Sequence, residues 1–190
     1  MRRALALALG LLVGVALAPA RAGADTAQGP YHWYLENSGA LFGALFGGPS
    51  VSQARNGTQL EAEGTGGFFV GRKATSVNGG GTYRLLNSNG NEIGKGNFEV
   101  RGPVRFEDQG PLNEGPNAIF SLLTDYRRGV MVAVADFGKL GVGKITIYCD
   151  AGSQGLEGFQ LKLRRLNFDK IVAGSTDFVK SDDSSMPGRF

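Results

Sequence analysis

The chain has 190 residues, a formal net charge of +3, one cysteine and one histidine. A single cysteine excludes an internal disulfide, and one cysteine with one histidine falls short of the roughly four ligands of a structural zinc site. Glycine is abundant, with 31 residues, but it follows no three-residue period, which excludes a collagen-like chain.

Residues 1–24 have the pattern of a secretory signal peptide. Two arginines follow Met1, an apolar run covers 4–18, and small residues lead to Ala24. This order of basic, apolar and small-residue parts is typical of a cleaved signal. The apolar run of about 15 residues is shorter than the roughly 20 needed to cross a bilayer. We therefore expect an exported protein (periplasmic, cell-surface or extracellular) with no transmembrane span in the mature chain.

Removing the predicted signal changes the charge balance. The signal contains Arg2, Arg3 and Arg21 but no acidic residue, so 17 basic and 17 acidic residues remain. Nucleic-acid binding depends on a basic excess that displaces counterions from phosphates. The balanced mature chain therefore predicts no nucleic-acid partner.

Residues 25–57 begin with an aromatic cluster. Tyr31, Trp33 and Tyr34 surround His32, the only histidine of the chain. Aromatic rings offer flat apolar surfaces with a polar tip, which suits stacking on sugars and other planar or apolar ligands. We predict these three aromatic residues, together with Tyr83 further along the chain, as ligand-binding residues. The alternative is that the rings fasten the N-terminal segment to the rest of the domain.

A tandem repeat follows the aromatic cluster. Gly39-Ala40-Leu41-Phe42 is followed directly by Gly43-Ala44-Leu45-Phe46 and Gly47. On a helix the glycines would share one face and the two phenylalanines another, and such spacing lets backbones approach closely. The pattern predicts a short apolar segment that packs on the sheet. The alternative is a helix acting as an interaction segment, for example in a homo-oligomer, through Gly39, Phe42, Gly43, Phe46 and Gly47.

Residues 58–180 form a predicted β domain, since apolar residues recur there with a period of two. One face of each expected strand is apolar, as in Leu60 and Ala62, Phe98 and Val100, Ile145, Ile147 and Cys149, and Phe159, Leu161 and Leu163. The stretch 78–81 is read as a turn or bulge, 87–91 and 138–143 as turns, and 124–128 as a polar turn. Residues 102–103 are expected to interrupt the strand pattern. Residues 181–190 are expected to be a disordered tail.

This pattern predicts an all-β fold of eight to ten strands, mostly of five to eight residues. Short connections favour a meander-type β-barrel or flattened barrel, with a β-sandwich as the alternative. The expected arrangement is similar to the barrels of lipocalins and allene oxide cyclases in topology only. No sequence motif of either family is present.

Groups that commonly carry catalysis are scarce. Activating a serine or cysteine nucleophile needs an imidazole, and His32 lies near the predicted mature N-terminus. Cys149 is in phase with Ile145 and Ile147, which predicts a buried core residue. No phosphate-binding loop, metal motif or cofactor motif is found. Arg127 and Arg128, in the expected polar turn, could meet an acidic ligand.

The sequence thus favours an exported, non-catalytic β domain that acts by binding or assembly. The expected partner is a small apolar ligand in the barrel mouth, a surface polymer or another protein. One alternative is an isomerase or cyclase acting on an apolar substrate, with Tyr83 as the inward-facing phenol. The other is a structural or filament subunit that docks through residues 39–47.

Overall fold

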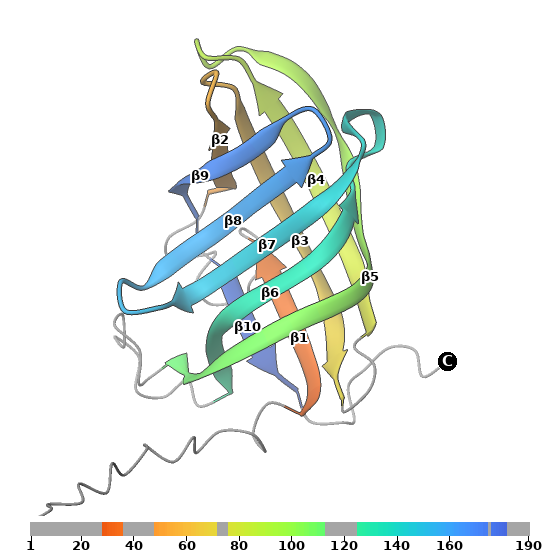
Figure 1. The fold of residues 1–190 in the computed structure, drawn as a ribbon, viewed down its shortest axis with the longest axis vertical. Coiled ribbons are helices and arrows are strands. Elements are labelled where there is room, and N and C mark those ends of the chain that lie inside the picture. The colour runs from red at the N-terminus through yellow and green to blue at the C-terminus, as the bar shows by residue number, and fades with distance from the viewer. Residues whose placement is uncertain (1–27, 36–47, 72–75, 113–124, 175, 182–190) are drawn as a thin grey trace, which may run out of the picture.

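The computed structural model describes residues 28–35, 48–71, 76–112, 125–174 and 176–181, which form one antiparallel sheet (Figure 1). The all-β prediction is confirmed. Within the described ranges the sheet has ten strands, and a 3-10 turn, η2 (Gly138–Leu140), follows the sixth. The strands are β1 (Gly29–Leu35), β2 (Ser50–Ala54), β3 (Gln59–Val70), β4 (Ser76–Leu86), β5 (Glu92–Pro111), β6 (Tyr126–Asp136), β7 (Val142–Ala151), β8 (Leu156–Leu163), β9 (Asn167–Ala173) and β10 (Thr176–Lys180).

The strands close on themselves through a ring of hydrogen-bonded neighbours. From β3 to β9 each strand pairs with the next in the chain, and β2 lies between β9 and β3. A second connection runs from β3 through β1 and β10 to β6. In Figure 1, β6, β7 and β8 run obliquely across the view, and β1 and β10 lie towards the lower end. The prediction of a meander-type barrel or flattened barrel is confirmed.

The β domain begins earlier in the chain than the sequence pattern predicted, and its strands are longer. The sheet starts at Gly29 rather than at Thr58, because β1 and β2 pair with successive parts of β3. β3 has 12 residues, β4 has 11 and β5 has 20. The strand β5 bends at Gly102, where φ is +86° and the register with β6 shifts. The expected interruption at 102–103 is therefore a bulge within one long strand.

The predicted turn or bulge at 78–81 was wrong, because these residues lie in the middle of β4. Gly79 and Gly81 pair with Gly66 and Gly64 of β3 in an unbroken register. A Cβ atom on Gly81 would lie 1.8 Å from the carbonyl oxygen of Glu63. Glycine is needed here because the two backbones approach too closely for any side chain.

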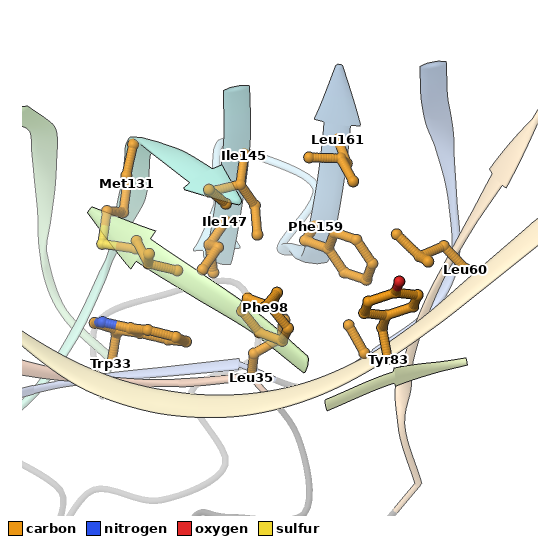
Figure 2. Close-up of a cluster of buried hydrophobic side chains, with 14 of the residues drawn as sticks. Trp33, Leu35, Leu60, Tyr83, Phe98, Met131, Ile145, Ile147, Phe159 and Leu161 are labelled. Carbon is orange, nitrogen blue, oxygen red and sulfur yellow. The ribbon is translucent and has the colours of Figure 1, made fainter. Parts of the chain in front are cut away.

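The barrel interior is packed with apolar side chains (Figure 2). Phe98 stacks on Phe137 with ring centroids 4.8 Å apart, and Phe68 meets Phe178 edge-on at 6.0 Å. Cys149 is 1 % exposed, which confirms its predicted place in the core. Apolar burial of this kind is the main stabilising contribution to the fold.

Several predictions concern residues outside the described ranges. These are the signal peptide at 1–24, the glycine and phenylalanine repeat at 39–47, and the tail after residue 181. Within the part of the chain that the structure describes, no helix has both the length and the apolar character needed to cross a membrane.

Candidate functional site

The predicted aromatic ligand-binding residues are divided between two faces of β1. Tyr31 and Trp33 point into the barrel and have no exposed surface, whereas Tyr34 lies on the opposite face and is half-buried. The Tyr31 ring stacks on Phe68 at 5.0 Å, and Trp33 Nε1 donates a hydrogen bond to the Asn78 carbonyl at 3.2 Å. A ligand could stack on the two inner rings only by displacing packed side chains.

Tyr83 also points into the barrel, on the side of Phe159 and Leu60 (Figure 2). Its hydroxyl donates a hydrogen bond of 3.1 Å to the carbonyl oxygen of Phe137. Burial raises the pKa of this phenol above its ordinary value. The phenolate that would act as a general base is therefore scarcely populated near neutral pH.

Arg127 and Arg128 lie in β6, which corrects the predicted polar turn. Arg127 Nη2 is 2.9 Å from Asp108 Oδ2, and the two side chains are only 12 % and 4 % exposed. Tyr31 donates a hydrogen bond to the same carboxylate at 3.3 Å. Burial, followed by the charge of Asp108, raises the pKa of Tyr31. Arg128 Nε is 3.7 Å from Asp150 Oδ2. Both arginines therefore have acidic partners within the protein.

The remaining candidates are the Cys149 thiol, as a nucleophile, and the side chains that could bind a metal ion. Burial raises the pKa of the Cys149 thiol, and the nearby carboxylates of Asp177, Glu157 and Asp150 add to this effect. The reactive thiolate form is therefore disfavoured. Across the described ranges, no group of three or more His, Cys, Asp or Glu side chains is placed to hold a metal ion.

On the outer surface of the barrel, the wall formed by β3 to β6 contains several paired charges. We call it the compensated wall, because three of its basic side chains, Arg84, Lys95 and Arg101, lie beside carboxylates. The ion pairs are Arg84 with Glu61 at 3.2 Å and with Glu92 at 3.0 Å, Lys95 with Glu92 at 3.5 Å, and Arg101 with Glu99 at 3.1 Å and with Asp136 at 2.7 Å. The charges of these three cations are therefore compensated by neighbouring carboxylates.

The outer surface over β7, β8, β9 and the end of β2 differs. We call it the basic face, and it has five cationic side chains: Arg55, Lys144, Lys162, Arg165 and Lys170. Among the described residues, Asp169 is the one carboxylate that lines the hollows of this face, and it lies 3.6 Å from Arg55. The other four cations form no ion pair with any residue in the described ranges.

Three adjacent hollows mark the basic face, with volumes of about 290, 310 and 340 Å³, and all three include Asp169 in their lining. The first lies over β7, β8 and β9. There Tyr148 donates a hydrogen bond of 2.9 Å to Gln160 Oε1, and Gln160 Nε2 donates one of 2.7 Å to the Asp169 carbonyl. The amide is thus held in a fixed orientation between two strands.

Comparisons with protein-family models, curated proteins and solved structures found no match to this chain. The candidate site therefore depends on the geometry and charge of the basic face.

The sequence analysis did not identify the basic face, although part of its signal is visible in the chain. Lys162, Arg164, Arg165 and Lys170 lie within nine residues, with Asp169 as the one acid among them. Arg55 and Lys144 are distant in sequence, and only strand pairing brings them near. Lys144 lies opposite Lys162 in the register of β7 and β8, and Gln53 lies opposite Lys170 in that of β2 and β9.

Proposed function

We propose that this chain is an exported, non-catalytic binding protein that takes an anionic ligand on the basic face. The observation that supports this proposal is the cluster of five cationic side chains around three hollows that share one lining carboxylate, Asp169. Clefts lined by charge of one sign attract ligands of the opposite sign and raise their local concentration.

The contrast with the compensated wall strengthens the proposal. There, Arg84 and Arg101 each lie within hydrogen-bonding distance of two carboxylates. Lys144, Lys162, Arg165 and Lys170 lack such partners within the described ranges, and their mutual repulsion is relieved when an anion binds. Hydrogen bonds from these cations to an anionic group are charge-assisted, and are therefore stronger than neutral ones.

The observed interior also favours binding over catalysis. The Tyr83 hydroxyl is bonded to a backbone carbonyl, and Asp108 is paired with Arg127. An acid–base catalyst must instead present its titratable group to the substrate. On the basic face, by contrast, Lys144, Lys162 and Lys170 are exposed around the hollows.

The test compares two charge reversals of equal size. Lys162→Glu/Arg165→Glu removes positive charge from the basic face. Its matched control is Arg105→Glu/Lys139→Glu, because these two cations are exposed and form no ion pair with any other described residue. Dextran sulfate serves as a polyanionic probe, with affinity measured by calorimetry at low and high salt.

The basic-face variant is expected to lose about tenfold or more in affinity, whereas the control stays within about threefold of the unmodified chain. Affinity of the unmodified chain should fall as salt rises, because exposed charges are screened beyond a Debye length of about 10 Å at 0.1 M. Equal losses in both variants would show that only total charge matters, and would overturn the proposal.

A further inference from the structure

Resting on the proposed function, we infer that the anionic ligand is an acidic polysaccharide that lies along the three hollows of the basic face. The inference depends on two further features of this face. One is the length of the cationic track, and the other is the set of neutral and acidic hydrogen-bonding groups between the cations.

The cationic track is longer than one small anion. It begins at the opposed pair Lys144 and Lys162 on β7 and β8, and it ends at Lys170 and Arg55 beside β2. Crossing from β7 to β2 covers three strand spacings of about 4.8 Å each, so the track spans roughly 14 Å. Because the three hollows share Asp169, one linear chain of linked units can follow the whole track.

The groups between the cations suit a ligand with hydroxyls as well as negative charge. Gln160 and Asn167 each offer an amide that donates and accepts hydrogen bonds, and Asp169 offers a half-exposed carboxylate that only accepts. Sugar hydroxyls donate to such acceptors. A polyphosphate has acceptor oxygens but few donors, so Asp169 in the centre of the track repels it and gains no hydrogen bond.

The same hollows are poorly suited to single-stranded nucleic acid. Binding of unpaired bases relies on exposed aromatic rings on which successive bases stack. Two aromatic residues line the hollows, and Phe168 is fully buried. That leaves Tyr148 as a single half-buried ring, which cannot stack successive bases. Polysaccharide binding does not require stacked bases, and polar contacts along the chain suffice.

The experiment measures binding of the purified chain to polygalacturonate, inorganic polyphosphate, an oligo-dT strand, neutral dextran and the galacturonic acid monomer at one salt concentration. Polygalacturonate is expected to bind at least tenfold more tightly than any of the others. The second measurement uses Asp169→Asn, which removes the central negative charge and replaces one of the two acceptor oxygens with a donating NH2 group. The ratio of polygalacturonate affinity to polyphosphate affinity is expected to fall at least threefold.

The matched control is Glu99→Gln, which removes one negative charge from the compensated wall and should leave that ratio unchanged. If no anionic polymer binds more tightly than dextran, the proposed function itself fails. If polyphosphate or oligo-dT binds as tightly as polygalacturonate, the anion site stands and the polysaccharide inference is overturned. Equal binding of the monomer, or an unchanged ratio in Asp169→Asn, also overturns it.

Discussion

The compensated wall and the basic face of this barrel differ in how their cationic side chains are paired with carboxylates. On the compensated wall, Arg84 and Arg101 are each held by two carboxylates at 2.7–3.2 Å. On the basic face, five cations share the hollows with Asp169 alone. A chain whose predicted mature form has balanced charge therefore retains a strong local excess on one side. Net charge constrains the whole molecule, whereas strand pairing determines where charge accumulates.

We expect the difference between the walls to affect the binding of anions more than the free energy of unfolding. Exposed ion pairs contribute only about 0.2–1 kcal/mol each, because solvent screens them and their side chains lose freedom. The pairs of the compensated wall thus add little to the free energy of unfolding, but they remove a local field that would attract anions. The following variants test this separation of roles, beginning with the largest expected effect.

The first variant tests whether the compensated wall is held by backbone packing rather than by its charges. In Gly81→Ala the new Cβ would lie 1.8 Å from the Glu63 carbonyl oxygen, so β3 and β4 must separate. We expect a loss of about 3 kcal/mol or more in the free energy of unfolding, measured in urea. Gly94→Ala is the control, since its nearest neighbour is an ordinary contact with Leu85 at 3.8 Å. Equal stability of the two variants would contradict this account.

The second variant compares a buried ion pair with the exposed pairs of the compensated wall. Arg127→Met leaves the buried Asp108 carboxylate without its cation, which is expected to cost about 3–5 kcal/mol. Arg101→Met removes a side chain that is 54 % exposed, and is expected to cost less than about 1 kcal/mol. Urea unfolding measures both. If Arg101→Met were as costly as Arg127→Met, the ion pairs of the compensated wall would contribute substantially to the free energy of unfolding, contrary to our expectation.

Much of the fold follows from local patterns in the chain. Alternation such as Ile145, Ile147 and Cys149 depends only on the period of a half-buried strand, and it correctly identified inward positions. The stretch 78–81 was misread because glycine serves both tight turns and close backbone approach. Only the pairing with Gly64 and Gly66 of β3 distinguishes the two uses.

The candidate site was harder to predict because the register of the paired strands brings its residues together. Lys144 and Lys162 are opposite each other in the pairing of β7 and β8, and Arg55 joins them through β2. That strand lies between β9 and β3, out of chain order, and no local pattern encodes such a neighbour. Arg127 was misjudged for the same reason, since its partner Asp108 is reached only across β5 and β6.

The smallest expected effect concerns the stability of the protein at low pH, to which a carboxyl of the compensated wall contributes. A hydrogen bond from Arg84 lowers the pKa of the Glu92 carboxyl, and Lys95 lowers it further. A carboxyl whose folded pKa lies below its unfolded value of about 4.3 stabilises the fold above that pH, and the contribution disappears as pH falls through the folded pKa. Glu92→Gln should therefore weaken the dependence of the unfolding temperature on pH below about 4.3.

A titration of the Glu92 carboxyl by NMR tests what lowers its pKa. Arg84→Gln should raise its pKa more than Lys95→Gln does, and the reverse order would show that the hydrogen bond is not the main cause. The same protonation affects the comparison of the walls. Once Glu92 is neutral, Arg84 loses one of its two carboxylate partners and resembles the cations of the basic face more closely. Discrimination between the two walls by an anionic polymer should therefore shrink in acid, if compensation by carboxylates is what distinguishes them.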